Sequence, residues 1–194
     1  MLTLTLAWLM AASVPVLEND YVLVTRDRVA CPVAATQQCG TRVIVALAEF
    51  ELDLGGIKRL LGRGDIGVVA ADKTYTVPAG SSFFEVTIKP AHPAALVPVE
   101  RIAPDKNALL YDSTDFFVFA EKLEPGQTRS RHSHSQRVVI QLNRTTLQQW
   151  PDGAPELFIE TVPEHPAFSP PVVHKVLNAG ALPLYGIIVE FKPE

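Results

Sequence analysis

The chain has 194 residues, of which 47% are hydrophobic and 20% are charged, with a formal net charge of −4. This length suits one large domain or two small modules, and the apolar content excludes a globally disordered chain. Without a cluster of Lys and Arg, the acidic balance argues against nucleic acid or an anionic membrane as partner. The 16 prolines and the scarcity of helix-period patterns predict an all-β protein with many turns.

The first 14 residues resemble the apolar part of a secretory signal, with small residues at Ala11–Ser13 where cleavage would fall. The run lacks a basic n-region and is too short to span a membrane, so no integral membrane segment is expected. Two interpretations remain: the signal of a secreted or periplasmic protein, or the buried first strand of a cytoplasmic one. Cys31 and Cys39 fit either, as a disulfide or as reduced thiols.

An internal repeat divides the rest of the chain. Four segments of the first half match four of the second half in the same order, which predicts a duplicated β module. The predicted modules span residues 15–90 and 105–194, joined by a Pro-rich linker at 91–104. The matched pairs are Asp20–Val24 with Asp115–Phe119, Arg42–Leu47 with Arg137–Leu142, Gly67–Ala70 with Pro171–His174, and Glu85–Pro90 with Ile188–Pro193.

Three histidines in the second module form a candidate metal site. His132 and His134 are one residue apart in a predicted strand, so both point to one face. His174, on a later β segment, can complete a triangle of nitrogen ligands that leaves positions open on a divalent transition metal. The alternative is that the first two are exposed strand residues and the third a core or turn residue. His92 and His165 each precede proline and are expected in surface loops.

The second module resembles a cupin, a jelly-roll β-barrel also described as a double-stranded β-helix. The first cupin motif has a glycine, five residues and His-x-His, and Gly126 followed by His132 and His134 fits this spacing. The second motif ends in His-x-x-x-Asn, which His174 and Asn178 fit. Two features depart from the family: the glutamate expected at position 138 or 139 is valine, and Ser169–Pro171 replaces Pro-x-Gly.

By the same resemblance, the whole chain after about residue 19 is similar to a bicupin. The N-terminal half is degenerate, because the repeat places Gln37, Cys39 and Ala70 where the C-terminal half has its three histidines. The resemblance therefore implies one metal-competent half, with His132, His134 and His174 as the metal ligands.

Strand alternation assigns the neighbouring side chains. If the strand continues unbroken after His134, the metal face is shared by Gln136, Val138, Ile140 and Leu142, with Arg131, Arg137 and Gln141 on the opposite face. One β-bulge would exchange the two sets. Gln136 is then a candidate catalytic residue. Tyr185, predicted with Phe168 at the barrel mouth, is the second.

The resemblance implies a metal-binding cupin that acts on a small organic molecule. Three neutral ligands leave the full charge on the metal, which favours anionic bidentate substrates. We favour dioxygenase-type chemistry on Fe²⁺, because cupins with three His ligands include thiol dioxygenases and enzymes that cleave diketones or aromatic rings. Zn²⁺, Mn²⁺, Ni²⁺ and Cu²⁺ suit the same ligands. Alternatives are a metal-dependent isomerase, lyase or decarboxylase, and a non-catalytic binding protein. A homodimer could form by edge pairing of sheets.

Overall fold

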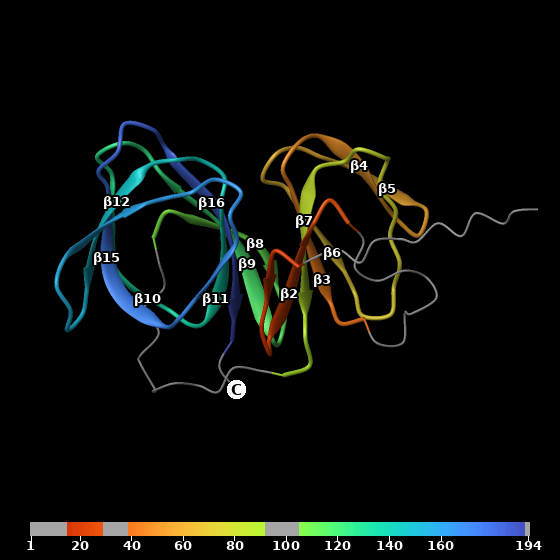
Figure 1. The fold of residues 1–194 in the computed structure, drawn as a ribbon, viewed down its shortest axis with the longest axis horizontal. Helices are drawn as coiled ribbons and strands as arrows, with labels where there is room; N and C mark the ends of the chain where they lie inside the picture. The colour runs from red at the N-terminus through yellow and green to blue at the C-terminus, as the bar shows by residue number, and fades with distance from the viewer. Residues whose placement is uncertain (1–14, 29–38, 92–104, 193–194) are drawn as a thin grey trace, which may run out of the picture.

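The computed structural model describes residues 15–28, 39–91 and 105–192, and all the elements in these ranges are β-strands. We call residues 15–91 the N-terminal module and residues 105–192 the C-terminal module; their strands form two groups that lie side by side (Figure 1). The signal-like segment and nearly all of the predicted linker lie outside the described residues. Within the described ranges, no helix could cross a membrane.

The C-terminal module is a barrel of two antiparallel sheets. One sheet has the order β10-β15-β12-β13, and the other has the order β14-β11-β16-β9-β8. The predicted all-β jelly-roll architecture is therefore confirmed. The strands are β8 (Asn107–Asp112), β9 (Phe116–Leu123), β10 (Thr128–His134), β11 (Arg137–Gln141), β12 (Thr146–Pro151), β13 (Leu157–Glu160), β14 (Ala167–Ser169), β15 (Val172–Asn178) and β16 (Leu184–Phe191).

The N-terminal module has a five-stranded sheet of order β1-β2-β7-β3-β6 and a separate β4-β5 hairpin. The five-stranded sheet of the C-terminal module, read from its other edge, has the order β8-β9-β16-β11-β14. When the five strands of each sheet are numbered along the chain, the two sheets have the same order, and the β4-β5 hairpin corresponds to β12-β13. The strands are β1 (Leu17–Glu18), β2 (Val22–Arg26), β3 (Arg42–Ala46), β4 (Phe50–Leu54), β5 (Ile57–Leu61), β6 (Ile66–Val69) and β7 (Phe83–Ile88).

Two strands of the C-terminal module, β10 and β15, have no equivalent among the strands of the N-terminal module's described residues. They are the strands on which His132, His134 and His174 lie. The register also corrects one predicted match. Val69 of β6 lies opposite Arg42 as Ser169 of β14 lies opposite Arg137, so β6 corresponds to β14 and Ala70 is not the counterpart of His174. Gln37 lies outside the described residues.

The main hydrophobic core lies between the facing five-stranded sheets of the two modules. Alternating residues of each central strand enter it, among them Val43 and Val45 of β3 and Val138 and Ile140 of β11, all fully buried. At its edge the ring of Tyr21 stacks on that of Phe168, with centroids 5.8 Å apart. The removal of this apolar area from water is the main force that holds the modules together.

Cys39 is buried and takes part in a disulfide. The other cysteine of the chain, Cys31, lies outside the described residues. Of the two predicted states, a disulfide or reduced thiols, the structure therefore describes the state of Cys39 alone.

Candidate metal centre

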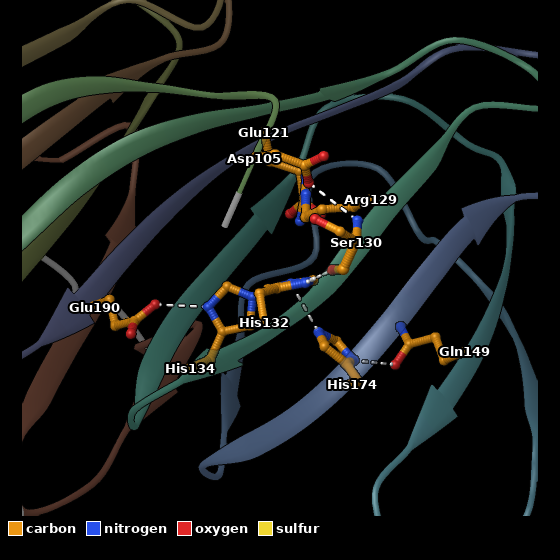
Figure 2. Close-up of polar contacts among 9 residues, drawn as sticks. All are labelled: Asp105, Glu121, Arg129, Ser130, His132, His134, Gln149, His174 and Glu190. Carbon is orange, nitrogen blue, oxygen red and sulfur yellow. Dashed lines mark hydrogen bonds and ion pairs between the residues drawn. The ribbon is translucent and has the colours of Figure 1, made fainter. Parts of the chain in front are cut away.

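The three predicted histidines meet inside the C-terminal barrel. His132 and His134 lie on β10 and His174 lies on the neighbouring β15, where it is the register partner of His132. The Nε2 atom of His132 is 3.1 Å from that of His134 and 3.1 Å from that of His174 (Figure 2). All three side chains are buried, and their candidate ligand atoms lie within 4.8 Å of one another.

Each histidine has a separate acceptor at its other ring nitrogen (Figure 2). His132 Nδ1 lies 2.7 Å from the carbonyl oxygen of Ser130, and His134 Nδ1 lies 2.7 Å from Glu190 Oε2. His174 Nδ1 lies 3.0 Å from Gln149 Oε1. A carbonyl, a carboxylate and an amide oxygen can only accept, so every Nδ1 carries the proton and donates it.

The tautomers have a direct consequence at the centre of the cluster. A neutral imidazole that is protonated on Nδ1 presents a lone pair at Nε2, so three lone pairs converge where no proton separates them. Burial lowers the pKa of both His134 and His174 to about 2, and burial also lowers the pKa of His132. The rings are therefore neutral at neutral pH, as metal ligands must be.

Two of the three nitrogen pairs have the spacing that a shared metal ion requires. Two nitrogens at about 2.0–2.1 Å from one ion, subtending about 90–109°, stand about 2.8–3.4 Å apart. The two Nε2 pairs at 3.1 Å fall in this range. The ring of Phe119 stacks on His134 with an interplanar angle of 6°, which restricts rotation of that imidazole. The cluster is thus shaped to hold a divalent metal.

Two irregularities in the backbone bring the charged residues around the site into the barrel. A register shift between Arg129 and His132 breaks strict alternation, so both side chains are fully buried. A break at Ser135 and Gln136 then separates β10 from β11, and Arg137 follows with its side chain inside the barrel. An unbroken strand would have placed Arg137 outside.

A buried ion pair lies beside the histidines. Arg129 Nη1 donates to Glu121 Oε1 over 2.9 Å, and the side chains are 0% and 9% exposed. Burial would raise the pKa of Glu121, but the charge of Arg129 and the other positive groups nearby outweighs it, so the pKa is lowered. Glu121 is therefore ionised and already paired with an arginine.

A cavity of about 460 Å³ opens next to His134 and His174. Its polar lining includes Arg137, Gln141 and Gln149, and the exposed His165 lies at its edge. Most of the wall is apolar: Val139, Leu147, Ile159, Val162, Val172, Val176 and Ile188. The arrangement places a mostly apolar space of small-molecule size against the cluster.

Strand alternation was wrong for the residues after His134. Val138, Ile140 and Leu142 pack in the core between the modules, whereas Arg137 and Gln141 line the cavity. The physical reason is the break at Ser135 and Gln136, which exchanges the two faces as a bulge would. Arg131 does point outward as predicted, and it binds the exposed Asp152.

The two candidate catalytic residues lie away from the cavity lining. Gln136 is at the break between β10 and β11, and its carbonyl accepts from Phe191 N. Tyr185 reaches the N-terminal module, where its hydroxyl lies against Gly64. Phe168, also predicted at the barrel mouth, stacks on Tyr21 in the same interface. No hydrogen bond or ring contact between described residues joins Gln136 or Tyr185 to the histidines, and their catalytic role stays a prediction.

Several residues of the site were missed from the sequence. Glu190, Gln149 and Glu121 lie on β16, β12 and β9, far from the His-x-His motif in the chain. One signal was available for Arg137: it repeats as Arg42 in the matched segment of the first half. Both arginines are buried at the first position of a central strand, and both donate to loop carbonyls, Arg42 to Ala70 and Lys73, Arg137 to Ser135 and Pro170.

No family model matches the sequence, and no curated protein matches it. Solved structures do share the fold. A cupin 2 conserved barrel domain protein from Leptotrichia buccalis is 14% identical over 97% of this chain and 92% of its own, with a TM-score of 0.56. AerE from Microcystis aeruginosa is 15% identical over 90% of this chain and 88% of its own, with a TM-score of 0.58.

Bacillus subtilis oxalate decarboxylase, a protein with Mn(II) centres, is 12% identical over 90% of this chain and 70% of its own, with a TM-score of 0.57. At these identities the likeness is one of fold. Together with the strand order, these neighbours show that the chain has the all-β barrel fold of cupin proteins.

Proposed function

We propose that the C-terminal module binds one divalent metal ion through His132, His134 and His174, and that it acts on a small organic molecule in the adjacent cavity. The observation that supports this is the convergence of three Nε2 lone pairs, each fixed by a separate acceptor at Nδ1. Three buried lone pairs at this distance repel one another, and a bound cation removes that repulsion.

The residues of the chain have distinct roles in this proposal. Ser130, Glu190 and Gln149 hold the protons on Nδ1, so the ligand nitrogens stay deprotonated and correctly aimed. The apolar cavity wall excludes water from a bound molecule, which strengthens electrostatic interactions there. When bound, the metal supplies Lewis-acid or redox chemistry.

We favour dioxygenase-type chemistry with Fe²⁺, because three neutral ligands leave both charge and coordination positions for a substrate and O₂. Zn²⁺, Mn²⁺, Ni²⁺ or Cu²⁺ would bind the same ligands. A redox-inert metal would instead support isomerase, lyase or decarboxylase chemistry. The Mn(II) centres of the oxalate decarboxylase neighbour belong to that protein, and they indicate only that a protein of this fold can hold manganese.

We further propose that the chain is a bicupin whose N-terminal module lost its metal site. The equal strand order of the two five-stranded sheets supports the duplication. The repeat places Gln37 and Cys39 where the C-terminal module has His132 and His134, which supports the loss.

The first experiment measures metal content. We expect about one equivalent of a divalent transition metal per chain as isolated, lost in His132→Ala and in His174→Ala. His165→Ala is the matched control, because His165 lies at the same cavity but outside the cluster, and it should keep its metal. Circular dichroism checks that each variant is folded. Full metal in folded His132→Ala and His174→Ala would refute the proposed centre.

The second experiment tests the chemistry. The metal-free protein is reconstituted with Fe²⁺ without oxygen, and oxygen uptake is then followed with thiols, diketones and catechols. Uptake that depends on both substrate and Fe²⁺, and that His174→Ala abolishes, supports dioxygenase-type chemistry. Native zinc with background uptake for every class rules that chemistry out and leaves the isomerase, lyase or decarboxylase and binding-protein alternatives.

A further inference from the structure

Arg137 is a buried cation that the metal centre does not use. Its side chain enters the barrel at the start of β11 and lines the same cavity as His134 and His174. The residue is 9% exposed. An arginine in this position has lost most of its hydration, which is costly unless another group replaces the water.

Protein atoms accept only some of the hydrogen bonds that the guanidinium of Arg137 can donate. Arg137 Nη1 donates to the carbonyls of Ser135, at 3.2 Å, and Pro170, at 2.8 Å. None of the ion pairs between described residues includes Arg137, although a guanidinium offers five N–H donors in a planar fork. Burial lowers the pKa of Arg137, and the attraction of Glu190 and Glu121 does not fully offset that effect.

The nearest carboxylates already have other partners. Glu190, the register partner of Arg137 on β16, accepts from His134 Nδ1 and from the backbone N of Ser135. Glu121 accepts from Arg129. The charge of Arg137 is therefore directed at a cavity whose other walls are mainly apolar, including Val139 on the same face of β11.

We propose that Arg137 binds the carboxylate of an organic acid whose apolar body lies against Val139, Leu147 and Val176. A planar carboxylate matches the guanidinium fork and replaces its lost hydration. The rest of the described lining is mainly apolar and includes no second lysine or arginine to pair with another carboxylate, so the ligand is a monoacid with a hydrophobic tail. The inference rests on the proposed function only in treating this cavity as the substrate site, and it makes Arg137 the residue that selects the substrate class.

The test compares two probes that differ only in charge, 4-phenylbutanoate and its neutral amide, 4-phenylbutanamide. Binding to the folded full chain is titrated calorimetrically without metal, in a chelator, so that the acid cannot gain affinity from a metal ion. We expect wild-type protein to bind the acid about tenfold or more tightly than the amide, because a hydrogen bond to a charged group is worth more than a neutral one.

Three variants make the result specific. Arg137→Gln should lose the preference for the acid, and Arg137→Lys should keep part of it, because lysine retains the charge without the fork. Arg144→Gln removes an exposed arginine of the same module and should leave the preference unchanged. If Arg137 had a purely structural role, Arg137→Gln would lower the affinity for both probes equally and leave the ratio of the two affinities unchanged.

Two results would overturn the inference: wild-type protein that binds neither probe or both equally, or an Arg137→Gln variant that keeps the preference for the acid. The same titration on folded His132→Ala separates this inference from the metal centre: the variant should still prefer the acid, because that preference depends on Arg137 and not on a bound metal. A preference for the acid together with a failed metal assay would refute the proposed function and leave the role of Arg137 standing. The reverse result would refute the role of Arg137 alone.

Discussion

His134 and Glu190 form a hydrogen-bonded pair of 2.7 Å between Nδ1 and Oε2, and both side chains are nearly fully buried. The second carboxylate oxygen accepts from the backbone N of Ser135 at 2.8 Å. The glutamate that the cupin motif leads one to expect on β11 is replaced by valine, and Glu190 enters from β16 instead. It contacts the imidazole and not the centre of the cluster, so it orients a ligand and raises its basicity.

Replacing Glu190 with glutamine should weaken metal binding by about 10- to 100-fold, because the neutral amide no longer holds the Nδ1 proton as firmly. The measurement is a competition titration of the metal-free protein with Zn²⁺ and a chromophoric chelator. Glu124→Gln, an exposed change of the same kind before β10, should leave the affinity unchanged. Equal affinity for Glu190→Gln and wild-type protein would show that the pair has no role in metal binding.

The pair formed by Arg129 and Glu121 predicts a large single-mutant cost. Arg129→Met leaves Glu121 buried without its partner, which should lower the free energy of unfolding by about 3–5 kcal/mol. Adding Glu121→Leu should recover much of the loss, because a buried pair replaced by apolar residues is often close to neutral. Urea unfolding monitored by tryptophan fluorescence measures both. A double variant no more stable than Arg129→Met would mean that Glu121 is not the source of the cost.

The sequence was enough to predict the fold class and the three converging histidines. Both rest on short-range patterns: turn residues between β-branched runs, and the spacing from Gly126 to His134 and from His174 to Asn178. Gly126 has a φ of 77° in the turn before β10, and buried Asn178 donates to the carbonyl of Leu123. These local requirements are visible along the chain.

The surroundings of the histidines were not predictable in the same way. Glu190 and Gln149 contact the rings only because β16 and β12 fold back beside them, and no local pattern encodes that pairing. Arg137 lies on the cavity face of β11 because the strand is broken at Ser135 and Gln136, and strand alternation cannot predict such a break. Tyr185 was assigned to the barrel mouth because its sequence context does not reveal that the outer face of β16 packs on a second module.

The contact between Tyr185 and Gly64 predicts that the module interface is sensitive to one methyl group. Gly64 has a φ of 87°, and an added Cβ would lie 2.1 Å from the Tyr185 hydroxyl oxygen. Gly64→Ala should therefore lower the free energy of unfolding by about 2 kcal/mol or more, from backbone strain plus overpacking. Gly55→Ala is the control, because Gly55 has a φ of 64° but open space around its Cβ, so it should show the strain alone. Equal losses in urea unfolding of the two variants would argue against a tight contact at Tyr185.

The buried histidines predict how the stability of the metal-free protein depends on pH. In the folded chain, burial lowers the pKa of His134 and His174 to about 2 and lowers that of His132 below its ordinary value of 6.5. The unfolded chain, with ordinary histidines, therefore binds more protons than the folded chain between about pH 6.5 and 2. Stability is fully present above this window and decreases as the pH falls into it.

The slope should approach about 1.4 kcal/mol per histidine for each pH unit below 6.5. Urea unfolding in chelator between pH 7.5 and 5.5 isolates this effect, because most carboxylates stay ionised over that range. The triple variant His132→Gln, His134→Gln and His174→Gln should have a flatter profile, since glutamine does not titrate. Bound metal should raise the stability of the wild-type protein by a nearly constant amount over this range, because the folded histidines are already neutral there and protons do not compete with the metal for their nitrogens. A metal-free wild-type protein that is equally stable at pH 7.5 and 5.5 would contradict the burial of neutral imidazoles on which the proposed metal centre depends.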